Sequence, residues 1–242
     1  MEKGRLTEAK ARYLFTLVTG TLDWADFADC DFVIEAVFEQ MEIKQQVFAE
    51  AEQVVSETCI FATNTSGLSV SEMASKLRHP ERVVGFHFFN PVAVLPLVEI
   101  IRGQQTNDVT LATVFAAAKQ LRKTGILVKD SAGFLVNRIL TKMLADCLDM
   151  VDEGADFQLV DEALLSLGLP MAPFELLGFV GPAVAAHVQE TLNRAFGPQS
   201  FPINDNLKKM VEAKIPGFYV GEPPNRQVDP ALKDLWQKKG DK

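Results

Sequence analysis

No two of the 15 glycines in this 242-residue chain are separated by a single residue. The sequence therefore contains neither the G-x-G-x-x-G turn nor the G-x-x-x-x-G-K-[ST] loop that hold nucleotide phosphates. Cysteine is scarce as well: Cys30, Cys59 and Cys147 lie far apart, without C-x-x-C spacing. This pattern argues against a disulfide framework and against a metal site, so we expect a thiol-reduced, cytoplasmic protein.

Basic residues and long apolar runs are also few. The chain has 24 Lys and Arg against 32 Asp and Glu, a formal net charge of −8, which is unfavourable for nucleic-acid binding. No apolar run approaches the roughly 18 residues that a membrane span needs. The polar, charged residues 1–12 do not form a secretory signal. Hydrophobic residues make up 48% of the chain, enough for one large or two small domains with real cores.

Short apolar runs alternate with segments of helical spacing over the first half of the chain. The apolar runs predict strands at 31–37, 59–63, 82–89, 95–101 and 125–128. Helical spacing predicts helices at 6–17, 42–57, 69–77 and 108–121. This alternation predicts an α/β fold with a mostly parallel, doubly wound sheet of Rossmann type. The connection after residue 91 is too short for a crossover helix, which leaves room for a local antiparallel pairing.

The second half of the chain is predicted to be helical. Helical spacing covers 136–151, 159–167, 173–177, 182–196 and 205–213, and a strand is expected at 217–220. We therefore expect a partial nucleotide-binding domain at 1–128, an all-helical domain at 129–220 and a linker or tail at 221–242. A nucleotide-binding sheet normally begins with a strand, a glycine-rich turn, a helix and a strand. That opening unit is missing ahead of the first predicted strand.

One histidine and one glutamate are the strongest candidates for chemistry. His87 ends an apolar run, and open α/β sheets bind ligands at the carboxyl ends of their strands. Glu99 lies inside the next apolar run, where a buried carboxylate needs a partner. If the two strands are neighbours, the pair makes a general base for an alcohol proton. The alternatives are a core histidine and a glutamate paired with Lys or Arg; His79 is expected at the surface and His187 packed in a helix.

Other polar residues are weaker candidates. The segment 64–67 follows a strand end, where its hydroxyls and amides hold a polar ligand or form an ordinary turn. Asn137 lies in an apolar helix start, which indicates either a specific hydrogen bond or bonding between helices. Glu39 and Lys44 follow the 31–37 strand, where they face a cofactor or are solvated helix charges.

Together these segments resemble the L-3-hydroxyacyl-CoA dehydrogenases of fatty-acid β-oxidation. The similar stretches follow the family's order and cover nearly the whole chain: 31–37, 64–66, 85–91, 97–100, 129–138, 168–173 and 217–219. The segments between them are most similar to the multifunctional α-subunits of bacterial fatty-oxidation complexes. The resemblance implies a nucleotide-binding α/β domain followed by a helical domain.

The resemblance also implies catalytic roles. His87 matches the base that takes the proton of the substrate's 3-hydroxyl while hydride passes to NAD. Glu99 matches the carboxylate that orients this base. Ser66 and Asn137 match residues that bind the acyl-CoA substrate near the reacting oxygen and the thioester.

NAD is the implied cofactor, and residues matching the family's nicotinamide contacts are Glu39, Lys44, Ser66 and Asn90. Three departures accompany the match. Ala172 stands where the family has glycine. The family's glycine-rich C-terminal motif is shortened at 214–219, which removes support for a contact between a lysine of this segment and the cofactor. The family's glycine-rich finger is expected to precede Met1, so we expect the chain as given to bind NAD very weakly.

Three functions stay open. The first is an NAD-dependent 3-hydroxyacyl-CoA dehydrogenase, represented by a fragment of a longer chain. The second is a non-catalytic remnant that serves as a structural or interaction module and cannot hold NAD. The third, another hydroxy-acid dehydrogenase, is disfavoured by the His87 and Glu99 pair because many such relatives use a lysine base. Family analogy implies a homo-oligomer formed through the helical domain, or a complex with a thiolase subunit.

Overall fold

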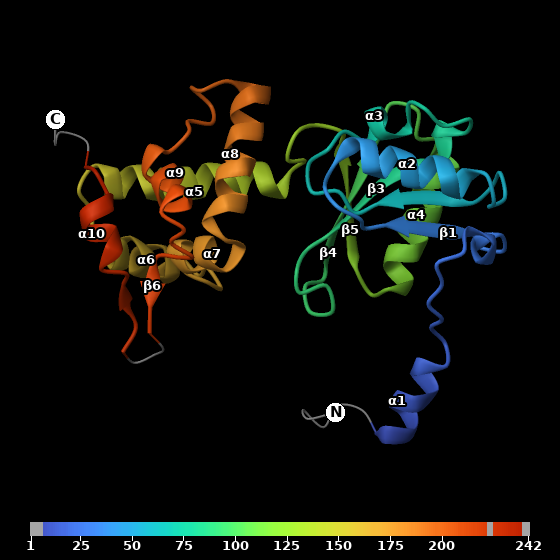
Figure 1. The fold of residues 1–242 in the computed structure, drawn as a ribbon, viewed down its shortest axis with the longest axis horizontal. Coiled ribbons are helices and arrows are strands. Elements are labelled where there is room, and N and C mark those ends of the chain that lie inside the picture. The colour runs from blue at the N-terminus through green and yellow to red at the C-terminus, as the bar shows by residue number, and fades with distance from the viewer. Residues whose placement is uncertain (1–6, 222–224, 239–242) are drawn as a thin grey trace. The chain divides into compact units, whose positions relative to one another are not determined.

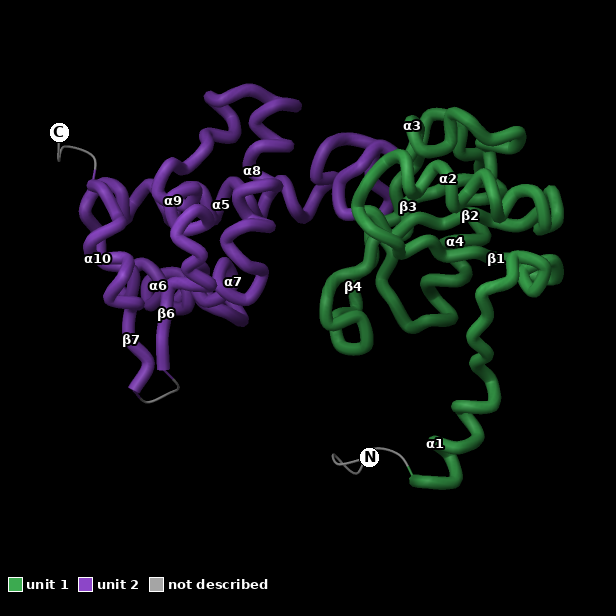
Figure 2. The backbone as a smooth tube through the Cα atoms, in the orientation of Figure 1, with its two compact units in different colours: residues 1–65, 70–125 green, residues 66–69, 126–242 purple. Residues whose placement is uncertain are grey.

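The computed structural model describes residues 7–221 and 225–238 and divides into two compact units (Figures 1 and 2). The α/β unit comprises residues 1–65 and 70–125, and the helical unit comprises residues 66–69 and 126–242. Among the described residues, no helix combines the length and the apolar character needed to cross a bilayer. The same residues contain no group of three or more His, Cys, Asp and Glu side chains arranged to hold a metal ion.

The sheet follows the predicted apolar runs. Its strands, in their order across the sheet, are β1 (Phe32–Glu35), β2 (Ile60–Thr63), β3 (Val83–Phe88), β4 (Leu97–Arg102) and β5 (Thr124–Lys129). β1 and β3 both pair with β2 in parallel, whereas β3 and β4 pair antiparallel. The predicted Rossmann-type sheet and its local antiparallel pairing are confirmed.

Helices cover both faces of this sheet (Figure 1). On one face, α2 (Met41–Glu52) packs against the sheet and α3 (Val70–Ala74), and its Phe48 stacks on Phe61 of β2 with ring centroids 5.0 Å apart. The other face is covered by α4 (Asp108–Gln120). Successive residues of a strand point to opposite faces of the sheet, so the strand side chains on the α4 face pack with that helix into a hydrophobic core. That core contains Ile60, Ala62, Val84, Phe86, Val98, Ile100, Leu111, Val114 and Ala118.

Two further types of element complete the α/β unit. The helix α1 (Glu8–Phe15) begins where the Thr7 side chain accepts a hydrogen bond from the Lys10 amide, and it contains no buried residue. Short 3-10 turns occupy Trp24–Phe27 and Pro80–Arg82. α1 and α3 are shorter than the segments of helical spacing that predicted them.

The helical unit has the helices that the sequence pattern predicts. They are α5 (Val136–Asp152), α6 (Phe157–Ser166), α7 (Pro173–Val180), α8 (Pro182–Phe196) and α9 (Asp205–Glu212). Asp156 caps α6 by accepting hydrogen bonds from two backbone amides, and proline opens both α7 and α8. At Ala172, just before α7, φ is −66°, so this position makes no demand for glycine. The core holds an aromatic cluster of Phe157, Phe174, Phe218 and Trp236.

The end of the chain differs from the prediction. The strand expected at 217–220 is reduced to β6 (Tyr219–Val220), which pairs antiparallel with β7 (Gln227–Val228), where only a turn or linker was expected. Part of that turn, residues 222–224, lies outside the described residues. The helix α10 (Ala231–Leu235) follows, and Leu232 and Trp236 are buried in the core of the helical unit. Two-residue strands are too short to leave an alternating pattern in the sequence.

The close approach of β3 and β4 gives a prediction about stability. Gly85 lies opposite Ile101, and a Cβ added at Gly85 would lie 2.6 Å from the Ile101 Cβ. Gly85→Ala is therefore expected to lower the free energy of unfolding by about 1–3 kcal/mol. Gly20→Ala is the control, because nothing lies within 4 Å of its added Cβ. Urea denaturation measures both variants, and unchanged stability of Gly85→Ala would contradict the close approach.

Candidate active site

The His87 and Glu99 side chains lie directly opposite each other on β3 and β4. His87 Nδ1 is 2.7 Å from Glu99 Oε2, and both side chains are buried. A carboxylate only accepts hydrogen bonds, so the contact places a proton on Nδ1, and in the neutral imidazole the lone pair is then on Nε2. The pairing predicted from the two apolar runs is confirmed, and it produces an imidazole with a fixed tautomer.

Neighbouring contacts hold the end of β3 in place. The Phe88 amide donates a hydrogen bond to Asn64 Oδ1, at 2.9 Å, which joins the ends of β3 and β2. The Phe89 ring lies 4.7 Å from the His87 ring, centroid to centroid. Asn90, a predicted cofactor contact, is exposed just beyond. The histidine therefore stands at an anchored strand end that leads into an exposed loop.

In the helical unit, the structure brings Ser66 and Asn137 together. The Asn137 side-chain amide donates a hydrogen bond to the Ser66 carbonyl, at 3.1 Å, and the Ser69 hydroxyl donates to Asp130 at 2.9 Å. The interpretation of Asn137 as a bond between helices is therefore wrong, because its amide holds a loop. Ser66 itself is exposed.

The structure gives Lys44 surroundings that differ from the predicted ones. Its side chain is 1% exposed, and its ammonium lies 2.8 Å and 3.0 Å from the two carboxylate oxygens of Glu35. The same ammonium is 3.2 Å from Glu39 Oε2 and 3.4 Å from the Val37 carbonyl oxygen. The alternative of a solvated charge is wrong for Lys44. Because protein groups enclose the ammonium, the structure does not support the direct cofactor contact predicted for it, whereas Glu39 is 40% exposed.

Sequence reasoning missed Glu35 and Thr63, which lie beside each other on β1 and β2. Both are buried, and the Thr63 hydroxyl donates to Glu35 Oε2 at 2.7 Å. The signal was present, because Glu35 is a carboxylate inside an apolar run, as Glu99 is. The same argument that demanded a partner for Glu99 applies to Glu35.

The remaining histidines are not part of these clusters. His79 is partly exposed, and its Nδ1 lies 3.2 Å from Glu81 Oε1. His187 is exposed on α8, so the prediction of a packed helix histidine is wrong.

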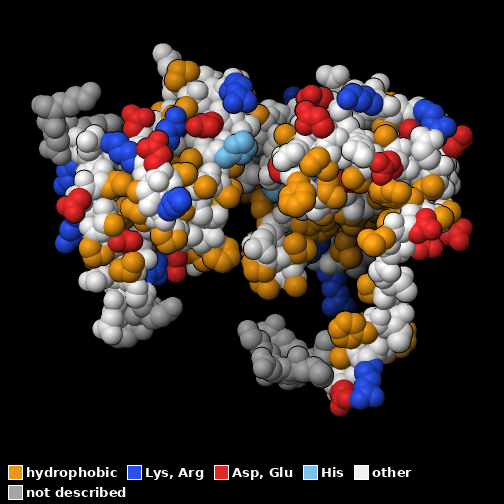
Figure 3. Space-filling view, in the orientation of Figure 1, with side chains coloured by type: hydrophobic (Ala, Val, Ile, Leu, Met, Phe, Trp, Pro, Cys, Tyr) orange, Lys and Arg blue, Asp and Glu red, His pale blue; other side chains and the backbone are white. Residues whose placement is uncertain are grey.

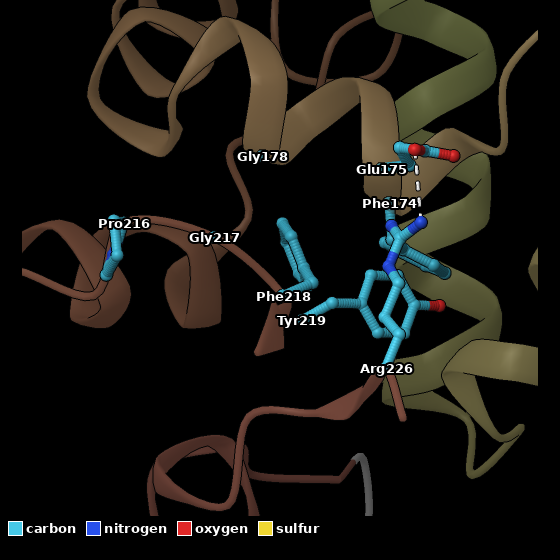
Figure 4. A pocket seen from close by; sticks show the side chains of 8 residues that line it. All are labelled: Phe174, Glu175, Gly178, Pro216, Gly217, Phe218, Tyr219 and Arg226. Atoms are coloured by element: carbon cyan, nitrogen blue, oxygen red, sulfur yellow. Dashed lines mark ion pairs between the residues drawn. The ribbon is translucent and has the colours of Figure 1, made fainter. Parts of the chain in front are cut away.

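A pocket in the helical unit contains none of the predicted site residues in its lining (Figure 4). Its volume is about 250 Å³. Arg226 forms an ion pair with Glu175 at 3.0 Å, and its guanidinium lies 4.4 Å from the centre of the Tyr219 ring. A Cβ added at Gly217 would lie 3.3 Å from the Gly178 Cα, so two glycines let the backbones meet. These contacts give the family-like segment 217–219 a packing role.

Two family models match the chain. The NAD-binding domain of 3-hydroxyacyl-CoA dehydrogenase matches residues 1–131, and the C-terminal domain matches residues 133–223. The fatty acid oxidation complex subunit alpha of Pseudomonas syringae pv. tomato is 38% identical over 250 residues, covering 97% of this chain and 34% of the relative. The corresponding Pseudomonas putida subunit is 42% identical over 222 residues, covering 92% and 31%. The chain spans about a third of the length of these curated relatives.

Solved structures match over most of both chains. Mycobacterium tuberculosis FadB2 has a TM-score of 0.84 and 34% identity, covering 88% of this chain and 76% of that one. The (S)-3-hydroxybutyryl-CoA dehydrogenase PaaH1 of Ralstonia eutropha has a TM-score of 0.84 and 34% identity, covering 98% and 81%.

Asp161, which is hydrogen-bonded to two residues of the pocket lining, predicts a pH dependence. Asp161 accepts hydrogen bonds from the Tyr219 hydroxyl and the Phe174 amide, yet burial outweighs them and raises the pKa of Asp161 above its ordinary value. The native state then keeps a proton that the unfolded chain releases. The contribution of Asp161 to the free energy of unfolding therefore falls as pH rises from about 4.

Urea denaturation between about pH 4 and about pH 7 measures this contribution. Asp161→Asn is expected to remove it, whereas Asp234→Asn, at an exposed position, is expected to retain it. An identical pH dependence in the wild type and in Asp161→Asn would contradict the prediction.

Proposed function

We propose a function that proceeds from one premise: the chain belongs to the 3-hydroxyacyl-CoA dehydrogenase family. The chain oxidises the 3-hydroxyl group of an L-3-hydroxyacyl-CoA to a ketone in fatty-acid β-oxidation, with NAD as the oxidant. The observation that carries this proposal is the His87 imidazole bonded to the buried Glu99 carboxylate. That pair supplies what an alcohol oxidation requires from the protein, a positioned acceptor for the hydroxyl proton.

The chemistry divides between protein and cofactor. When bound, NAD supplies the acceptor for the hydride that leaves C3 of the substrate. His87 Nε2 takes the proton from the 3-hydroxyl as the C–O single bond becomes a carbonyl. Glu99 stabilises the imidazolium that forms, because a buried carboxylate at 2.7 Å interacts strongly with the new charge.

The position and exposure of Glu39 support its assignment to the nicotinamide half of NAD. Glu39 is partly exposed at the carboxyl ends of β1 and β2, where open α/β sheets bind nucleotides, and its carboxylate is held by Thr65 and Lys44. We assign Glu39, Ser66 and Asn90 to this half of the cofactor. The 242 residues contain no G-x-G turn for the pyrophosphate.

On the substrate side, we assign Ser66 and Asn137 to the reacting oxygen and the thioester. The hydrogen bond that joins them in the helical unit supports this assignment. The proposal divides the work between a cofactor part at 1–128 and a substrate part at 129–220; Leu232 and Trp236, in the segment predicted to be a linker or tail at 221–242, are instead buried in the core of the helical unit.

Exposed apolar side chains support an association through the helical unit, whose surface is drawn in Figure 3. Leu167, just after α6, Phe179 on α7 and Val184 on α8 are more than half exposed, and α7 packs against both α6 and α8. Exposed apolar side chains on helices that pack together are typical of interaction surfaces. The partner is a second copy or a thiolase subunit; the Pseudomonas relatives are alpha subunits of an oxidation complex by name. The three free thiols favour the cytoplasm as the compartment.

Removal of the proposed base tests the function. His87→Gln is expected to lower kcat for 3-hydroxybutyryl-CoA by about 10²–10⁴-fold, the usual contribution of a positioned general base. Acyl-CoA binding should change little. Glu99→Gln should also slow the reaction, because the imidazolium loses its counter-charge. NADH absorbance at saturating NAD measures the rates, and calorimetry measures binding.

The matched control is His79→Gln, which changes a histidine in a loop of the same unit. Its rate should equal that of the wild type. A near-normal rate in His87→Gln would exclude His87 as the base. A measurable rate in the wild-type chain would exclude the alternative of a non-catalytic remnant.

The association has its own test. Phe179→Glu places a charge among the exposed apolar groups of the helical unit and should convert the assembled protein to monomers at micromolar concentration. Val109→Glu is the control, since Val109 is 72% exposed on α4 in the other unit. Light scattering after gel filtration gives the masses. Equal masses for Phe179→Glu and wild type would exclude this surface.

A further inference from the structure

We infer that Glu35 is a positioning residue that acts through Lys44 to hold Glu39 in place for the cofactor. The inference rests on the cofactor role proposed for Glu39. It concerns a residue for which the resemblance implies no role.

Five residues form a closed ring of contacts at the carboxyl ends of β1 and β2, four links between side chains and one from a backbone amide. Lys44 Nζ contacts Glu35 at 2.8 Å and Glu39 at 3.2 Å. Thr63 donates its hydroxyl to Glu35 and accepts a hydrogen bond from the Thr65 amide at 3.2 Å. The Thr65 hydroxyl closes the ring by donating to Glu39 Oε1 at 2.6 Å. The loop after β1 and the loop after β2 are thereby joined.

Within this ring, Glu39 is held by both of its oxygens. Oε1 accepts from Thr65, and Oε2 faces the Lys44 ammonium. Two contacts on one carboxylate fix its rotation as well as its position. The exposed part of Glu39 is therefore presented in one orientation at the edge where the cofactor is proposed to bind.

Glu35 is the anchor of the ring because it holds Lys44 inside the protein. Its carboxylate is buried, receives both close contacts of the ammonium, and also accepts from the Val37 amide at 2.7 Å. An ammonium is kept out of water only by a well-bonded counter-ion. Without the Glu35 charge, Lys44 keeps only the half-exposed Glu39 and the Val37 carbonyl among the contacts described above, so the ammonium moves toward water and draws Glu39 away from Thr65.

The experiment compares Glu35→Gln with Glu52→Gln. Glu52 is a suitable control because, like Glu35, it is a buried carboxylate paired with a cationic side chain. Its partner is Arg82, and both residues lie outside the ring. Acetylation of Lys44 by acetic anhydride, followed by mass spectrometry, reports whether the ammonium has left the interior. Lys44 is expected to be unreactive in the wild type and in Glu52→Gln, and reactive in Glu35→Gln.

A second measurement follows Glu39 itself. Nicotinamide mononucleotide, the nicotinamide half of NAD, is added while amide NMR signals of Thr65 and Glu39 are recorded; adenosine monophosphate is the negative control. The apparent affinity should fall about five- to tenfold in Glu35→Gln and stay unchanged in Glu52→Gln. A merely structural role would lower stability in both variants without this difference in affinity.

Each result decides a different point. An unreactive Lys44 in Glu35→Gln, or an unchanged nucleotide affinity beside a reactive Lys44, would overturn the inference. If nicotinamide mononucleotide leaves the wild-type signals unmoved, the proposed cofactor role of Glu39 fails, and Lys44 reactivity still decides whether Glu35 holds the ring. If Glu35→Gln does not fold, Thr63→Val takes its place; it removes the hydrogen bond from Thr63 to Glu35 and the one from the Thr65 amide to Thr63, and a lowered nucleotide affinity is the expected result.

Discussion

A carboxylate buried in an apolar sheet must be given donors, and the α/β unit meets this demand repeatedly. Among its described residues, Glu35, Glu52 and Glu99 are each almost fully buried. Burial acts to raise the pKa of Glu52, but the amides of Arg78 and His79 and the Arg82 guanidinium outweigh it and hold this pKa below its ordinary value. Leaving any of these groups unpaired would cost several kcal/mol. Much of the polar architecture of this unit follows from these partnerships.

The partnership between His87 and Glu99 depends on the register of β3 and β4. Side chains alternate between the two faces, so a slip of one residue would turn Glu99 toward the apolar core under α4. The contact between Gly85 and Ile101, two residues along the same pair of strands, opposes such a slip. The Ile101 side chain fills the space where any Cβ at position 85 would lie. The packing of Ile101 against Gly85 thereby helps to keep His87 opposite Glu99.

The sequence was sufficient for the features that repeat and for the partner of Glu99, but not for the partners of Glu35. Alternating apolar runs predicted the sheet, and the short connection after residue 91 predicted the antiparallel pair that joins His87 to Glu99. Prediction failed for strands too short to show an alternating pattern and for side chains whose burial depends on tertiary contacts. β6 and β7 have two residues each, which is too few for periodicity. Lys44 was assigned to the surface or to a cofactor, because its burial depends on Glu35, an anion on a different element.

The partners of Glu99 and Glu35 explain why we propose a catalytic role for the first pair and a positioning role for the second. Glu99 is paired with an imidazole, a group that accepts a second proton on its other nitrogen, so the pair can change its charge during a reaction. Glu35 is paired with an ammonium, a hydroxyl and an amide, which only donate in these contacts. No proton acceptor results from that set, but the orientation of every member is determined. The identity of the donor, rather than the burial of the carboxylate, separates the cluster that we propose to be catalytic from the cluster that we infer to position Glu39.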